Sequence, residues 1–191
     1  NDQIVFSDSI PVGGVHITSD IVRGLGTKPE DAEKIKILHG SAFSNETDEF
    51  TNIEVPIITD DGDIHNQQIP KAMLTAIIKP RTEEIFELAK IRLNYLNIKS
   101  NQINKVILCG GGANLNNIRE LASTYFQTNV RIGRPIGLIG LPEIMQTPTF
   151  ACLAGLLIKS LEKEKILKLN EMNSGFFNYF GKIGSWFDEN L

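Results

Sequence analysis

Apolar residues recur along this chain with two spacings, and these predict a mixture of strands and helices. Short apolar runs that end at Gly, Pro or Asp predict strands over residues 5–11, 53–59, 64–69, 104–108 and 130–132. Longer runs with helical spacing predict helices over residues 18–26, 30–38, 70–96, 113–126 and 149–169. We therefore expect an α/β protein in which Asp61-Gly62 closes a hairpin between the second and third strands.

Two of these helices carry specific boundary signals. The first should begin at Thr18 or Ser19, because either hydroxyl can cap the exposed N–H groups of a first turn. The long helix after residue 70 contains Pro80, which has no backbone N–H and should kink or split the helix.

The densest aromatic cluster lies in residues 175–191. On a helix that turns about 100° per residue, its apolar side chains share one face and its polar and charged side chains share the other. The apolar face holds Phe176, Phe177, Tyr179, Phe180, Ile183, Trp186 and Phe187. A helix with one polar side should lie on a bilayer or pack on its own domain rather than cross a membrane, and the pattern alone leaves both open.

Composition narrows the class of protein. The chain has 191 residues, 41% of them hydrophobic, and a net charge of -4, which suits one globular domain or two small ones. No basic stripe is present, so we expect no nucleic-acid binding. Cys109 and Cys152 lie in apolar runs without metal-ligand spacing, so we interpret them as buried free thiols and expect no metal site and no catalytic residue.

Three motifs carry candidate chemistry. Gly110, Gly111 and Gly112 join a strand to a helix, where a ligand could approach the backbone, although a tight structural turn is as good an explanation. Gly13-Gly14 repeats this pattern before the first helix. Glu33 and Lys36 share a helix face, either as an exposed ion pair or as contacts to the ribose and base of a nucleotide.

Together and in this order, the motifs resemble the second half of the nucleotide fold shared by actin, heat-shock chaperones and sugar kinases. More narrowly, the chain resembles the FtsA family of bacterial cell-division proteins. The matching stretches are IPVGGVHITSDIVRGLGT, AEKIKILHGSA, IIKPRTEEIFELAK, VILCGGGANLNNIRELA, VRIGRP and the aromatic tail. The resemblance implies the second half of an actin-like (ribonuclease-H-like) ATPase fold with a C-terminal amphipathic helix, in a chain whose N-terminal part is missing.

The resemblance also implies an organisation into parts. Residues 1–30 and 100–148 would form a nucleotide-side subdomain, and residues 31–99 an upper subdomain on the FtsZ-binding side. Residues 149–169 would return toward the missing first domain, and residues 175–191 would be the membrane-targeting helix.

The same resemblance implies how ATP binds. Gly110, Gly111 and Gly112 would approach the adenosine, Glu33 and Lys36 would contact ribose and base, and Gly13 and Gly14 would line the site. ATP with Mg²⁺ would bind the longer parent, and we do not expect tight binding or ATPase activity from this chain.

Finally, the resemblance implies a role in cell division. The parent would tether the FtsZ ring to the inner face of the cytoplasmic membrane at the septum, assemble into actin-like filaments and recruit other division proteins. Arg81 and Glu84 would contact the acidic C-terminal tail of FtsZ, and the aromatic tail would bind membrane lipids. The alternatives are a pilus-assembly scaffold, a shape-determining actin homologue or a small-molecule kinase of the same superfamily, none of which needs this tail.

Overall fold

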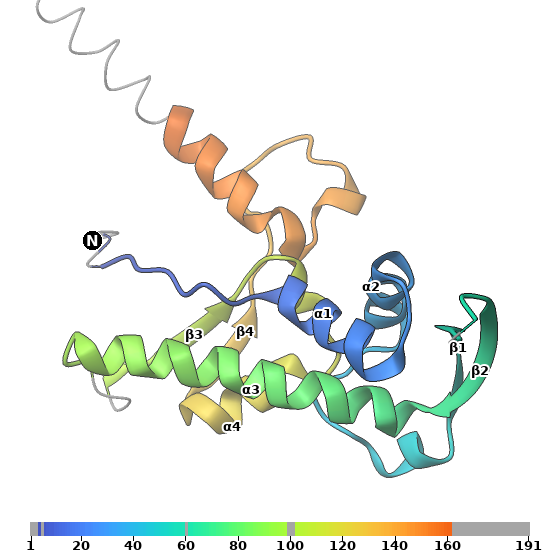
Figure 1. Cartoon of the computed structure of the whole chain (residues 1–191). Coiled ribbons are helices and arrows are strands. Elements are labelled where there is room, and N and C mark those ends of the chain that lie inside the picture. The colour runs from blue at the N-terminus through green and yellow to red at the C-terminus, as the bar shows by residue number, and fades with distance from the viewer. Residues whose placement is uncertain (1–3, 5, 60, 99–101, 162–191) are drawn as a thin grey trace, which may run out of the picture.

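The computed structural model describes residues 4, 6–59, 61–98 and 102–161 (Figure 1). Its helices and strands are α1 (Gly14–Leu25), α2 (Pro29–His39), β1 (Asn52–Ile58), β2 (Ile64–Pro70), α3 (Lys71–Tyr95), β3 (Lys105–Leu108), α4 (Ile118–Phe126) and β4 (Asn129–Ile132). Short 3-10 helices cover Glu46–Glu49, Gly111–Asn114, Glu143–Met145 and Pro148–Phe150, and residues 151–161 are helical. The aromatic tail, residues 175–191, lies outside the described residues.

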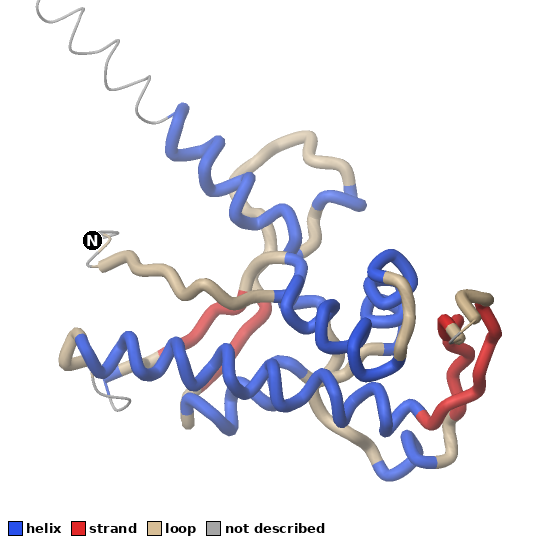
Figure 2. Tube along the Cα trace, in the orientation of Figure 1, coloured by secondary structure: helices blue, strands red, loops and turns tan. Residues whose placement is uncertain are grey.

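Two small sheets lie toward opposite ends of α3 (Figure 2). β1 and β2 form the predicted antiparallel hairpin, with Asn52 opposite Pro70 and Ile58 opposite Ile64. β3 and β4 pair in parallel, which requires a crossover connection, and α4 supplies it. The predicted hairpin and the two later strands are therefore confirmed.

Helix α3 is the element that the two hydrophobic cores share. Its first half packs with α1, α2 and the hairpin around Ile17, Ile21, Leu25, Ala32, Ile35, Ile53, Val55, Ile69, Leu74 and Ile78. Its second half packs with α4 and β4 around Ala42, Phe86, Ile118, Leu121, Ala122, Phe126 and Val130. Ile85 and Leu115 pack against both clusters, so the cores are continuous. The subdomain boundaries near residues 30 and 100 stay a prediction.

Helix α1 begins at Gly14, so the predicted start at Thr18 or Ser19 is wrong. Gly13 is the N-cap: its N–H donates to His16 Nδ1 at 3.2 Å, and its carbonyl accepts the His16 N–H at 2.9 Å. The Ser19 hydroxyl instead donates to the carbonyl of Val15, one turn back. The predicted C-terminal boundary is confirmed, because Gly26 closes the helix in the left-handed region with φ 64°.

Helix α3 continues through Pro80 as one element, so of the two predicted effects the split is wrong and the kink stays a prediction. Pro80 cannot donate to the carbonyl of Ala76. Both residues are exposed, so water can satisfy that carbonyl while Leu74, Ile78 and Thr82 keep the opposite face buried.

Two further expectations are corrected. Within the described residues, no backbone hydrogen bond joins residues 6–11 to another strand, so the predicted first strand is not formed there. Cys109 and Cys152 are free thiols, as predicted, but both are exposed. Cys109 lies where β3 ends and the glycine loop begins, and Cys152 lies on a helix whose Leu153 and Leu156 are also exposed. In the described part of the chain, no helix is both long and apolar enough to cross a bilayer.

A buried ion pair anchors the loop before β1 to the start of α3. The side chain of Asp48 is 4% exposed, and its Oδ1 lies 3.0 Å from Lys71 Nζ. Its Oδ2 accepts the backbone N–H of Asn45 at 2.9 Å. That backbone hydrogen bond, together with Lys71, holds the pKa of Asp48 below its ordinary value, although burial acts in the opposite direction.

We expect Asp48→Asn to lower the free energy of unfolding at pH 7 by about 1–3 kcal/mol, because Lys71 loses its charged partner. The folded-state pKa is the lower one, so this stabilisation is present above the ordinary pKa of about 4 and is lost as the pH falls through the folded value. Urea denaturation at pH 7 and pH 3 measures both effects.

The matched control is Glu49→Gln, an exposed position on the same short helix, which should change stability at neither pH. An Asp48→Asn deficit of equal size at pH 7 and pH 3 would contradict this account of the ion pair.

Candidate functional site

A cavity of about 910 Å³ opens between α1, α2 and the glycine loop that follows β3. Its walls include Gly14, Val15, Ile17, Thr18, Pro29, Glu30, Glu33, Lys36, Ile37, Gly111, Gly112, Asn114, Leu115, Thr147 and Thr149. The structure thus brings together the predicted Gly14, Glu33, Lys36, Gly111 and Gly112 from three separate segments. The other two predicted glycines, 13 and 110, do not line the cavity and each precedes a residue that does.

The three loop glycines, Gly110, Gly111 and Gly112, differ in the physical reason for having glycine at each position. Gly110 has φ 90° and ψ 175°, a region that only glycine adopts without strain. Gly111 and Gly112 lie outside that region, and a Cβ at either would have no heavy atom within 4 Å. Neither backbone conformation nor internal packing therefore explains glycine at these two positions, whereas close approach of a ligand does.

The loop is tied to the segment on its far side. Gly110 donates its backbone N–H to the carbonyl of Pro148 at 2.8 Å. The Asn114 amide donates to Thr149 Oγ1 at 2.9 Å and to the carbonyl of Gly111 at 3.2 Å. These bonds hold the glycine loop against the segment that contains Pro148 and Thr149.

Charged and hydroxyl groups meet where α1 contacts α2. Lys36 Nζ lies 2.7 Å from Glu33 Oε2 and donates to Thr18 Oγ1 at 2.8 Å. The Thr18 hydroxyl donates to the same Glu33 oxygen at 2.5 Å. The predicted Glu33–Lys36 pair is therefore a bridge between two helices and not only an intrahelical pair.

Burial raises the pKa of Glu33, but hydrogen bonds from Lys36 and Thr18 outweigh it and hold the pKa below its ordinary value. The side chain is 45% exposed toward solvent and the cavity. A charged carboxylate accepts hydrogen bonds and donates none, so it suits a ligand that presents hydroxyl groups. Sequence reasoning missed Thr18 as part of this site, because it interpreted that hydroxyl as a helix cap.

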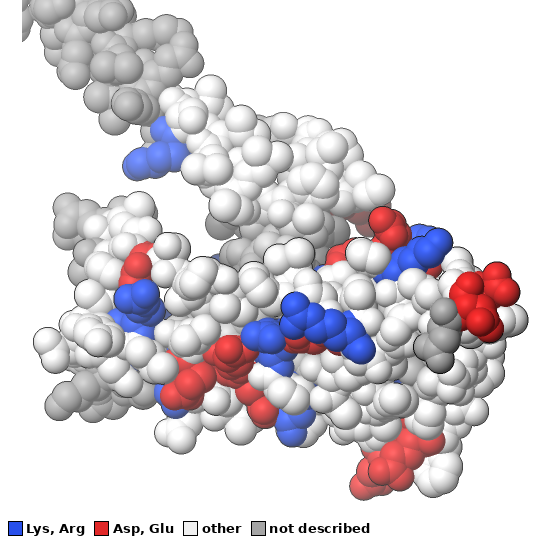
Figure 3. Space-filling model, viewed as in Figure 1, with Lys and Arg blue, Asp and Glu red and all other residues white. Residues whose placement is uncertain are grey.

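The predicted partner-binding residues lie on α3, where charges of both signs gather (Figure 3). Arg81 Nη1 bonds to Glu84 Oε2 one turn further along, so the two predicted residues do meet. The Arg81 guanidinium also forms a bidentate pair with the carboxylate of Asp20 on α1. Its Nε donates to Oδ2 at 2.5 Å and its Nη2 donates to Oδ1 at 3.1 Å. Asp20 was not predicted, since nothing in the sequence relates it to Arg81.

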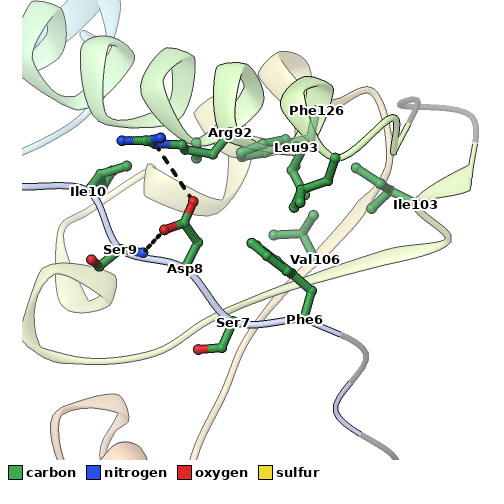
Figure 4. A pocket seen from close by; sticks show the side chains of 12 residues that line it. Phe6, Ser7, Asp8, Ser9, Ile10, Arg92, Leu93, Ile103, Val106 and Phe126 are labelled. Atoms are coloured by element: carbon green, nitrogen blue, oxygen red, sulfur yellow. Dashed lines mark hydrogen bonds and ion pairs between the residues drawn. The ribbon is translucent and has the colours of Figure 1, made fainter.

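A second, apolar cavity of about 390 Å³ lies between the extended segment 6–10 and the C-terminal part of α3 (Figure 4). Phe6, Leu93, Val106 and Phe126 are among its walls, and Arg92 lies 3.7 Å from Asp8 at its edge. None of the predicted site residues lines it. The cavity beside the glycine loop, which Glu33, Lys36 and Thr18 line, is therefore the better candidate for a nucleotide.

The fold is that of part of an actin-like α/β protein. The structure resembles two crystal structures of MreB5 from Spiroplasma citri, one bound to AMPPNP (TM-score 0.62, 20% identity) and one bound to ADP (TM-score 0.63, 22% identity). Each likeness covers 87% of this chain and 49% of the MreB5 chain, and at this identity it shows the fold alone. The family model for the cell division protein FtsA matches residues 1–155, and the chain belongs to that family.

Individual relatives agree with this assignment. Cell division protein FtsA of Agrobacterium fabrum is 34% identical over 99% of this chain and 44% of its own length. FtsA of Escherichia coli K12 is 33% identical over 78% of this chain and 36% of its own length. This chain therefore spans less than half the length of these relatives. Family membership confirms the predicted resemblance to the FtsA family.

The glycine geometry predicts different effects of alanine at three neighbouring positions. Gly110→Ala should lower the free energy of unfolding by about 1–3 kcal/mol, because its φ of 90° would be strained. Gly111→Ala and Gly112→Ala should leave it unchanged or raise it by up to about 1 kcal/mol, since alanine fits and restricts the unfolded chain. Urea denaturation of the three variants tests this, and an equal loss in all three would mean that the glycines serve the turn rather than a ligand.

Proposed function

We propose that this chain is the second half of an actin-like, ribonuclease-H-like ATPase that tethers the FtsZ ring to the membrane during cell division. The observation that carries the nucleotide part is the cavity in which Glu33 and the glycine loop face each other. Membership of the FtsA family supports the cell-division part. The MreB5 neighbours, which were solved with AMPPNP and ADP, support a nucleotide as the ligand.

In this proposal ATP lies between α2 and the glycine loop. The open backbone of Gly111 and Gly112 lets adenosine approach closely, and Glu33 accepts hydrogen bonds from ribose hydroxyls. Of the described residues that line the cavity, only Lys36 is basic, and three acceptors already hold its ammonium group. The triphosphate therefore finds little positive charge here, so this chain should bind ATP weakly and the longer parent should bind it more tightly.

In this proposal, tethering requires no covalent bond to be made or broken. One surface holds FtsZ, the amphipathic tail holds the cytoplasmic face of the inner membrane at the septum, and ATP controls assembly into actin-like filaments that recruit other division proteins. The protein would be peripheral, attached by residues 175–191, with its nucleotide-side and upper subdomains facing the cytoplasm.

Arg81 remains the best candidate to receive the acidic C-terminal tail of FtsZ. A guanidinium has five N–H donors, and Asp20 and Glu84 occupy three of those of Arg81, leaving one on each Nη atom. The Arg81 side chain is 25% exposed, so these donors are accessible to a peptide. The two neighbouring carboxylates, however, neutralise much of the positive charge that would attract an acidic segment.

We therefore expect Arg81→Gln to weaken binding of a synthetic FtsZ C-terminal peptide, and Glu84→Gln to strengthen it severalfold by removing a competing negative charge. Fluorescence anisotropy at low and high salt measures both effects, which should shrink as salt screens the charges. Arg119→Gln, an exposed arginine in a local pair with Glu120, is the matched control. Unchanged affinity in both α3 variants would place the FtsZ tail elsewhere.

The membrane part is tested by co-sedimentation with phospholipid vesicles of zwitterionic and of mixed anionic composition. Deletion of residues 175–191, or the exchanges Phe180→Glu and Trp186→Glu, should abolish sedimentation with lipid. Lys182 is outnumbered by Asp188 and Glu189, so apolar burial should dominate and the anionic fraction should matter little. Equal sedimentation of the intact and truncated chains would remove the tail as the anchor.

A further inference from the structure

The contact between α1 and α2 contains a hydroxyl group to which neither the fold nor the proposed function gives a role. Thr18 is 8% exposed and lies on the side of α1 that faces α2 and the cavity. Its Oγ1 is 2.5 Å from Glu33 Oε2 and 3.2 Å from the carbonyl of Gly14. A hydroxyl has one proton, and the much shorter distance assigns that proton to Glu33.

The ammonium group of Lys36 has no donor to spare in this arrangement. Its three N–H groups meet three acceptors: Glu33 Oε2 at 2.7 Å, Thr18 Oγ1 at 2.8 Å and the carbonyl of Gly14 at 3.2 Å. Lys36 could contact a ligand only by giving up one of these bonds. Its geometry is therefore that of a residue that holds other groups in place.

The two oxygens of the Glu33 carboxylate are treated differently. Both Lys36 and Thr18 bind Oε2. In the described part of the chain, no residue donates to Oε1, although the side chain lines the cavity. With Oε2 held from two sides, the carboxylate is fixed in one orientation and Oε1 is the oxygen left for a ligand.

We propose that Thr18 is a positioning residue, whose hydroxyl acts with Lys36 to fix Glu33 so that Oε1 accepts hydrogen bonds from a ribose diol. The ribose assignment rests on the proposed function, whereas the positioning role rests on the contacts alone. A carboxylate that is held rigidly discriminates more strongly against a ligand without hydroxyl groups than a freely rotating one, because it cannot turn to another donor.

The test compares Thr18→Val, which keeps the shape and removes the hydroxyl, with Thr18→Ser, which keeps the hydroxyl. Ser19→Ala is the matched control, because the Ser19 hydroxyl bonds to Val15 on the exposed side of the same helix. All variants are made in the full 191-residue chain, and circular dichroism confirms that each is folded. The first readout is the pKa of the Glu33 carboxyl group by carbon-detected NMR titration, which does not depend on any ligand.

Thr18→Val should raise the pKa of Glu33, and Thr18→Ser and Ser19→Ala should leave it at the wild-type value. The second readout is NMR titration with ATP and with 2′,3′-dideoxy-ATP. The wild-type chain should bind ATP better, and Thr18→Val should weaken ATP binding by about tenfold, toward the dideoxy value, without changing dideoxy-ATP binding.

The outcomes separate the two claims. An unchanged pKa of Glu33 in Thr18→Val would overturn the positioning role, regardless of how strongly the variant binds ATP and dideoxy-ATP. A raised pKa with equal affinity for the two nucleotides would support positioning by Thr18 and overturn the ribose assignment. Absence of binding by either nucleotide, with the pKa raised, would contradict the proposed nucleotide function and leave the Thr18–Glu33 contact supported.

Discussion

The candidate site depends on one partly buried contact, in which the ammonium group of Lys36 joins two helices. Its bonds to the carbonyl of Gly14 and the hydroxyl of Thr18 hold the first turns of α1, and its bond to Glu33 stays within α2. A charge in this position is favourable only when its donors are satisfied, and all three are. Two walls of the cavity are thereby fixed relative to each other before any ligand arrives.

The second constraint is that one long helix serves both cores. α3 packs against α1 and the hairpin with its first half and against α4 with its second. The Asp20–Arg81 pair adds a polar link between α1 and α3. Helix α1 thus contacts the proposed FtsZ-binding residue Arg81 through Asp20, and it lines the proposed nucleotide cavity through Gly14 and Thr18.

Much of the fold could be predicted from local pattern. The hairpin, α2, β3 and β4 follow from apolar periodicity and turn residues, which act over a few positions. The first strand could not, because a strand needs a partner, and alternation in residues 5–11 says nothing about whether one is present. The start of α1 was mislocated because the Gly13–His16 pair caps the helix, whereas the sequence offers Thr18 as a more typical cap.

For the site, Glu33, Lys36 and the glycines were predicted through family resemblance. The involvement of Thr18 and Asp20 depends on how α1 packs, which no local pattern encodes.

The central claim is that the glycine loop and Glu33 face one ligand cavity that takes an adenine nucleotide. The most direct measurement is a titration of the isotope-labelled chain with ADP, followed by backbone amide NMR at concentrations suited to weak binding. The account predicts saturable shifts at Gly14, Glu33, Gly111 and Gly112, with Leu93 and Val106 of the apolar cavity unaffected. Shifts confined to the apolar cavity, or none at saturating ADP, would contradict it.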